Sequence, residues 1–238
     1  SLYANHYSLS YKDAAKKLFS ERNIQDIQSS IKVKERFAAK NLQRQNEEQL
    51  ARAKSIKQAT QLYSSAQSIV GTLAEKYLSN VRGIKHGVPA DFKFASQCWH
   101  KDLRTQKPAL LIPAFDEHGK LQSVNRIYLS SDANKLNIIL KSASDSAMLA
   151  TQKAVLGPSK AATVFINKVE NSPVTYLTEG VENALSIRQS IANANISSCF
   201  GIGQLKNIAL SSETKTVVIC ADNDGANLAT KKALEQTV

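Results

Sequence analysis

Apolar positions in the first third of the chain recur at helical spacing. Residues 11–22 place apolar side chains three to four positions apart, which predicts an amphipathic helix. Residues 33–69 contain no Gly or Pro and are rich in Ala, Gln, Lys, Arg and Glu, a composition that favours helix. Apolar residues are sparse there, so we expect one or two exposed helices. Such a segment is a linker, a partner-binding helix or a basic arm on DNA, and its composition does not choose among these.

The pattern changes after Gly71. Thr72 and Glu75 form a T-x-x-E capping box, which predicts a short helix from residue 73 to about 81. Apolar runs at 109–115 and 121–129 flank the turn residues 116–119 and predict a β-hairpin. The other expectations here are irregular structure over 84–107, a short helix with a Gly-Pro break over 145–158, and a strand over 162–166.

Strand and helix patterns alternate in the last third of the chain. The expected strands are 174–178, 196–200 and 216–221, and the expected helices are 181–193, 205–210 and 226–236. The continuous apolar run at 216–221 is typical of a parallel strand covered on both faces. This alternation predicts a doubly wound α/β arrangement, in which ligands bind outside the carboxyl ends of the strands.

Composition narrows the class of protein. Hydrophobic residues make up 42% of the 238 residues, enough to form a core. No apolar run approaches the length of about 18 residues that a spanning helix requires, and no signal-peptide pattern opens the chain. The three Cys are far apart and form neither a disulfide framework nor a zinc ribbon. We therefore expect a cytoplasmic protein that has no contact with a membrane.

The net charge of +11 is unevenly distributed. Residues 1–85 hold 15 Lys and Arg against 7 Asp and Glu, whereas residues 172–238 hold 5 against 6. The basic N-terminal part predicts contact with a polyanion, of which nucleic acid is the commonest. The slightly acidic C-terminal part is suited to a cation.

Acidic residues follow two of the expected strands. Glu179 ends one strand, and Asp222 and Asp224 follow the other, with Gly180 and Gly225 leaving room for tight turns. Carboxylate oxygens suit Mg²⁺, so the pair of acidic clusters indicates metal-assisted phosphoryl or nucleotidyl transfer. The alternative is that these residues merely form turns and helix caps, but their place at successive strand ends favours the metal site.

These residues resemble the Toprim domain, which bacterial-type primases, type IA and II topoisomerases, some nucleases and recombination proteins share. The preceding sequence is similar to plasmid- and phage-borne Toprim primases, and the resemblance covers about residues 66–238. The matching segments, in chain order, are 69–78, 82–84, 108–111, 125–129, 134–135 and 179–185.

The resemblance implies an α+β protein in three parts. Residues 1–65 form a basic helical region or linker, 66–171 a small primase-like α+β subdomain, and 172–238 an α/β Toprim domain with a parallel sheet and flanking helices. A complete Toprim sheet usually has a further strand and helix after the second acidic motif, so we expect a domain truncated at the C-terminus.

The resemblance also assigns roles residue by residue. Glu179 matches a general acid or base that also touches the metal, and Asp222 and Asp224 match ligands of Mg²⁺ or Mn²⁺. Template and nucleotide triphosphate are expected at three basic residues: Arg82, Arg126 and Lys135. Gly180 and Glu182 are possible supporting residues. Asn183 stands where many bacterial primases carry an acid, and Glu182 either replaces that acid or simply lies on the helix.

The favoured function is a metal-dependent primase-like nucleotidyltransferase that makes primers on single-stranded DNA from nucleoside triphosphates. It would belong to a larger plasmid or conjugative-transfer protein with helicase or relaxase modules. The alternatives are a Toprim nuclease and a non-catalytic DNA-binding fragment of a conjugative relaxase or helicase.

Overall fold

A computed structural model describes residues 10–21, 24–141, 147–221 and 235. The chain divides into two compact units, Ser1–Ala51 and Arg52–Val238. No helix within the described residues is long and apolar enough to cross a lipid bilayer.

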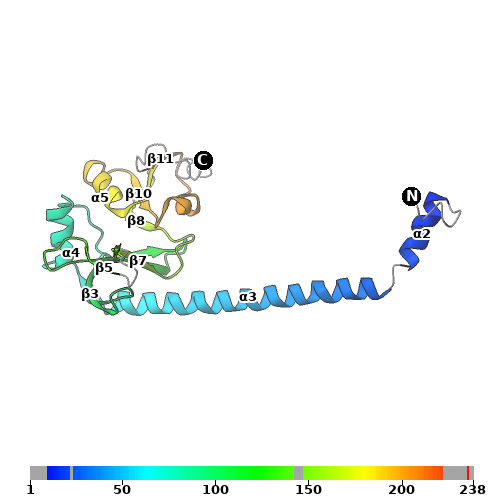
Figure 1. Ribbon diagram of the computed structural model, residues 1–238. Helices are drawn as coiled ribbons and strands as arrows, with labels where there is room; N and C mark the ends of the chain where they lie inside the picture. The colour runs from blue at the N-terminus through cyan, green and yellow to red at the C-terminus, as the bar shows by residue number, and fades with distance from the viewer. Residues whose placement is uncertain (1–9, 22–23, 142–146, 222–234, 236–238) are drawn as a thin grey trace. The chain divides into compact units, whose positions relative to one another are not determined.

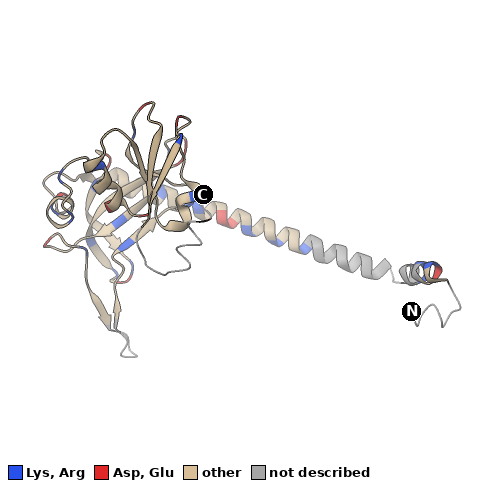
Figure 2. Cartoon of the chain, turned by 90° about the horizontal axis from the view of Figure 1, so that it is seen from above, with Lys and Arg blue, Asp and Glu red and all other residues tan. Residues whose placement is uncertain are grey.

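The first unit is helical. Helix α2 (Tyr11–Glu21) begins after Ser10, whose hydroxyl accepts a hydrogen bond from the Asp13 backbone N–H at 3.1 Å. Helix α3 (Ile24–Ser65) is one uninterrupted helix of 42 residues, which confirms the helical prediction for 33–69 up to Ser65. Residues 36–54 of α3 are exposed and carry charges of both signs (Figure 2). This surface is polar enough to remain in water.

The second unit contains a five-stranded antiparallel sheet, ordered β1-β2-β3-β4-β7 (Figure 1). Its strands are β1 (Gln67–Ser68), β2 (Lys93–His100), β3 (Thr105–Phe115), β4 (Leu121–Tyr128) and β7 (Lys153–Leu156). The pairing of β3 with β4 confirms the predicted hairpin.

Two expectations for this region are wrong. Strand β2 lies within 84–107, and strands β6 (Ala147–Leu149) and β7 replace the helix expected within 145–158. A bulge between Ala95 and Cys98 interrupts the two-residue alternation of β2, so the strand pattern is hidden in the sequence. Strand β6 pairs with β5 (Ile139–Lys141) in a separate two-stranded sheet.

The five-stranded sheet separates two cores. Leu110, Ile112 and Ile127 point to one face and pack in a cluster with residues of the C-terminal region. The intervening residues, such as Leu111, point to the other face and pack against Ala59 near the end of α3. Because both faces are covered, the strands are apolar on both sides, as the burial of 109–114 shows.

Thr72 and Glu75 cap the start of helix α4 (Leu73–Lys76), as predicted, although each accepts from the residue before the donor of a standard capping box. The Thr72 hydroxyl accepts from the Ala74 N–H at 3.2 Å, and the Glu75 carboxylate accepts from the Gly71 N–H at 2.7 Å. The helix continues as a π-turn, η1 (Tyr77–Val81), in which the Arg82 N–H donates to the Tyr77 carbonyl. This widened turn buries the Tyr77 side chain and leaves Arg82 exposed.

A second sheet has the order β11-β9-β10-β8. Its strands are β8 (Val164–Asn167), β9 (Val174–Thr178), β10 (Asn195–Ser198) and β11 (Thr216–Cys220). Strands β11, β9 and β10 are parallel, and β8 is antiparallel to β10. The mixed helices and strands, with a partly parallel C-terminal sheet, confirm the α+β class and the strands predicted near 174–178 and 216–221.

Helix α5 (Val181–Ser190) follows β9 and packs against β8, β9 and β10 (Figure 1). The expected helix at 205–210 is a 3₁₀ segment, η2 (Ile202–Asn207). Strand β11 pairs with β9 only, and Thr216 and Val217 are exposed, so in the described part of the chain it is an edge strand that is not covered on both faces. Apart from Glu235, the helix expected at 226–236 lies outside the described residues.

Candidate active site at the carboxyl ends of two parallel strands

Glu179 lies directly after β9, at the carboxyl edge of the parallel strands. Thr178 of β9 pairs in register with Cys220 of β11, so the chain leaves both strands side by side. Asp222 and Asp224 follow β11 in the sequence but lie outside the described residues. The neighbouring strand ends are the arrangement that the sequence predicted for the two acidic clusters.

Gly180 forms the turn from β9 into α5. Its φ of −105° is open to any residue, and a Cβ there would meet only the Asn183 side chain, at 3.8 Å. The Thr178 hydroxyl donates to the Gly180 carbonyl at 2.9 Å and tightens this turn. The backbone at position 180 therefore does not require glycine, contrary to the expectation from the sequence.

Glu179 is half-buried and lines a cavity of about 290 Å³ between the two sheets. Asn125 of β4 and Lys153 of β7 line the same cavity, together with the start of α5 and Cys199–Gly201. The Asn125 side-chain oxygen is buried and makes no hydrogen bond to any described residue. This oxygen is therefore a buried acceptor that lacks a partner among the described residues.

Glu182 is the second residue of α5, three positions after Glu179, and is 5% exposed. Its Oε1 lies 2.9 Å from Nζ of Lys135 and 2.8 Å from Nζ of Lys153. The Lys153 ammonium also donates to Oε2 at 3.1 Å, and the Tyr77 hydroxyl donates to Oε1 at 3.1 Å. One carboxylate of α5 thus binds side chains from η1, β7 and the segment after β4. We call Glu182, Tyr77, Lys135 and Lys153 the Glu182 cluster.

The Glu182 cluster shifts the ionisation of its members. Burial by itself raises the pKa of Glu182, but the charges and hydrogen bonds of Lys153 and Lys135 outweigh burial and lower that pKa to about 2. Burial also lowers the pKa of Lys135, against the opposing effect of Glu182. Burial and the adjacent Glu182 carboxylate raise the pKa of the Tyr77 phenol. The carboxylate is therefore ionised at neutral pH.

A second cavity, of about 540 Å³, lies on the other side of the cluster. Arg82, Lys135 and Tyr77 line it, together with the turn at 130–134 and Gln152. Within that turn the Asn134 amide donates to Asp132 at 2.7 Å. The structure therefore brings two of the three basic residues, Arg82 and Lys135, into one cavity, and Glu182 joins Lys135 to Lys153 in the wall of the Glu179 cavity.

Arg126 does not join these basic residues. Strand alternation places it on the face of β4 that carries Val124 and Tyr128, opposite Asn125. Its Nε donates to the Ala154 carbonyl at 3.3 Å, and its guanidinium lies 5.8 Å from the centre of the Tyr128 ring. These contacts fit a residue that supports the sheet.

Sequence reasoning missed Asn125, Lys153 and Tyr77. Lys153 was missed because 145–158 was expected to be helical. Asn125 and Tyr77 lie in segments that resemble Toprim primases, but no role was assigned to them. Among the described residues no group of three or more His, Cys, Asp or Glu could hold a metal. The Glu179 carboxylate, which lines the cavity, is nevertheless an oxygen donor of the kind that suits Mg²⁺.

Two family models match the chain. Residues 53–166 match a domain of unknown function (DUF7146), and residues 174–238 match the Toprim domain. No curated protein matches the sequence. A solved structure, the primase fragment of the bacteriophage T7 primase-helicase protein, matches with a TM-score of 0.34 and 14% identity over 61% of this chain. The match spans 52% of that structure, about half its length.

The Toprim match begins at the first residue of β9 and includes Glu179, the Glu182 carboxylate and the acidic motif after β11. Toprim domains generally bind divalent metal ions such as Mg²⁺. Residues 174–238 of this chain therefore match the Toprim domain.

Proposed function

We propose that this chain is a metal-dependent, primase-like nucleotidyltransferase that synthesises primers on single-stranded DNA. The observation that carries the proposal is the shared cavity of Glu179 and Lys153. It combines a carboxylate at the end of a Toprim strand with an ammonium group from the upstream sheet. Chemistry on a nucleoside triphosphate needs both kinds of group, one for the metal or a proton and one for phosphate charge.

The acids would hold the metal ion. Asp222 and Asp224, with Glu179, supply the hard oxygen ligands that Mg²⁺ prefers, and Mn²⁺ would also be accepted. When bound, the ion would neutralise charge on the phosphates. The Asn125 oxygen is a further acceptor for a water or an N–H group of the substrate.

The chain's own side chains would position the reactants. Arg82, Lys135 and Lys153 would hold the triphosphate by charge-assisted hydrogen bonds, with Arg82 suited to a forked contact. A primer 3′-hydroxyl oxygen would form a bond to the α-phosphorus, the bond to pyrophosphate would break, and Glu179 would accept the hydroxyl proton. Most of the acceleration would come from alignment and charge neutralisation.

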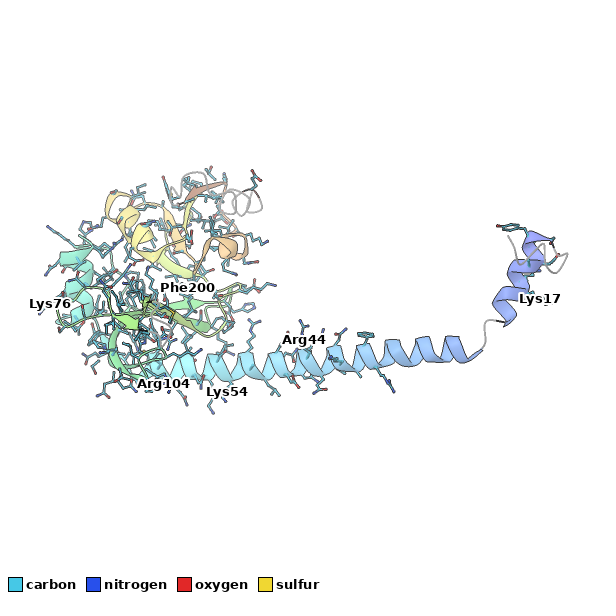
Figure 3. The ribbon with its side chains drawn as sticks, in the orientation of Figure 1. Lys17, Arg44, Lys54, Lys76, Arg104 and Phe200 are labelled. Carbon is cyan, nitrogen blue, oxygen red and sulfur yellow. The ribbon has the colours of Figure 1, made fainter. Side chains whose placement is uncertain are left out.

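The basic N-terminal region would bind the template. Lys40, Arg44 and Lys54 lie on the exposed part of α3, and Figure 3 shows the labelled Arg44 and Lys54 extending from the helix. Contacts of this kind with phosphate are independent of base sequence. The resemblance to plasmid primases favours a larger conjugative-transfer protein in which helicase or relaxase modules are partners.

Primer synthesis tests the proposal. The chain is incubated with single-stranded DNA, labelled nucleotides and Mg²⁺ or Mn²⁺, next to the Asp222→Asn/Asp224→Asn variant. New short labelled products that the variant does not make would support the primase. Shortened template without new products would favour a Toprim nuclease, and a gel shift without either would favour a non-catalytic DNA-binding role.

A further inference from the structure

Glu182 holds two ammonium groups at one oxygen. Nζ of Lys135 and Nζ of Lys153 lie 2.9 and 2.8 Å from the same Oε1, so the two cations are close neighbours. Two like charges at such short range repel by several kcal/mol at an effective dielectric constant of about 20, unless an anion lies between them. The Glu182 carboxylate is that anion, and the three charges sum to +1.

Both lysines keep donors for another ligand. An ammonium group has three N–H donors, and neither lysine uses all three on Glu182. The side chains of Lys135 and Lys153 remain 25% and 39% exposed, and they line the Arg82 and Glu179 cavities respectively. The two lysines, held by the same carboxylate, therefore present positive charge to both cavities.

The anchor of this pair is itself rigid. Glu182 lies in the first turn of α5, where a carboxylate also interacts favourably with the helix dipole. The buried Tyr77 hydroxyl donates to the same oxygen, so the carboxylate has little freedom to turn. These contacts fix the Glu182 carboxylate between the two lysines.

We propose that Glu182 is a positioning residue that holds Lys135 and Lys153 together as one clamp for a polyphosphate group across the two cavities. The proposal deepens the proposed function and takes from it only the class of ligand. Glu182 does not touch the reacting atoms in this account. It acts by keeping the lysine donors adjacent and correctly directed.

Two other roles for Glu182 make different predictions. If Glu182 competes with phosphate for the lysines, Glu182→Gln would free both cations and tighten anion binding. If it only attaches α5 to the upstream sheet, any variant that folds would bind as well as the wild type. In the positioning role, Glu182→Gln separates the lysines by repulsion and weakens binding.

The experiment measures binding of inorganic tripolyphosphate to the full chain by calorimetry in metal-free buffer. Glu182→Gln is compared with Glu182→Asp, which retains the charge but is one methylene shorter, and with Glu213→Gln as an exposed control. We expect about tenfold weaker binding for Glu182→Gln, equivalent to about 1.4 kcal/mol. A smaller loss is expected for Glu182→Asp, and none for the control. Circular dichroism verifies that each variant is folded.

Tighter or unchanged binding in folded Glu182→Gln would overturn the proposal. If Glu182→Gln does not fold, Glu182→Asp decides between the roles. Wild-type affinity in Glu182→Asp would contradict the proposal, because the shorter side chain should not hold both lysines in place. A wild-type chain that binds no tripolyphosphate also overturns the clamp. The proposed function is judged separately, because primer synthesis with Mg²⁺ does not depend on metal-free binding.

Discussion

The Glu182 cluster should make the stability of the second unit fall steeply in acid. The pKa of Glu182 is lowered from 4.5 to about 2 in the folded chain. A lowered carboxyl pKa stabilises the fold above the unfolded value of 4.5, and this stabilisation is lost as the pH falls toward 2. A pKa lowered from 4.5 to about 2 corresponds to about 3 kcal/mol of folding free energy at neutral pH.

The lysines do not obscure this effect. Burial lowers the pKa of Lys135, which subtracts from stability at neutral pH. Lys135 nevertheless stays protonated throughout the acid range, so its contribution is constant there. Asp102, Asp116 and Asp132 also have lowered pKa values, through hydrogen bonds that their carboxylates accept, and contribute to acid sensitivity independently of Glu182. A comparison with Glu182→Gln cancels these common contributions.

Urea unfolding at several pH values from 7 to 2 measures the difference. The only Trp, Trp99, is 51% exposed, and its carbonyl accepts from the Tyr128 hydroxyl, so its fluorescence reports on the upstream sheet. The wild type should exceed Glu182→Gln by about 3 kcal/mol at pH 7, as expected for a broken buried pair, and the gap should close toward pH 2. Parallel stability profiles for the two proteins would refute the assigned ion pairs.

Three further predictions address the fold and the nucleic-acid interface. Gly157→Ala should destabilise the second unit by about 3 kcal/mol or more, since its φ is +100° and a Cβ would lie 2.3 Å from the Gln122 carbonyl oxygen. Gly119→Ala, with φ +75° and open space, should lower stability by only about 1 kcal/mol in the same urea assay. Thr72→Ala removes the cap of α4 and should lower the urea-derived stability by about 1 kcal/mol, whereas Thr72→Ser, which retains the hydroxyl, should leave the cap intact. Binding of single-stranded DNA, followed by fluorescence anisotropy, should weaken with salt, and replacement of Lys40, Arg44 and Lys54 by Gln should reduce the log–log slope by about 2. An unchanged slope would show that α3 does not contact the phosphates.

Local sequence patterns were sufficient where an element depends on its own residues. The Thr72 cap, the hairpin of β3 and β4, and the passage from β9 into α5 all formed as predicted. Strand β2 was missed because its bulge breaks the alternation, and β7 was missed because four residues carry too little periodicity. Pairing with β4, which is distant in sequence, stabilises β7.

The site was predictable only in part for the same reason. The position of Glu179 at the end of a strand followed from one short motif, and the resemblance singled out Arg82 and Lys135, which line one cavity. The pairing of Lys153 with Glu182 joins residues 29 positions apart and has no local signature. Arg126 looked equivalent to the other basic residues, but strand alternation turns it to the opposite face of the sheet.

The most direct test of the central claim is primer synthesis by Glu179→Gln, with Glu213→Gln as a matched control on the same domain. Labelled nucleotides, single-stranded DNA and Mg²⁺ are supplied at equal protein concentration, and DNA binding is measured in parallel. The account predicts that Glu179→Gln loses synthesis by at least about 100-fold, as removal of a positioned acid–base group does, while DNA binding remains. Primer synthesis at the control's rate by Glu179→Gln would contradict the account.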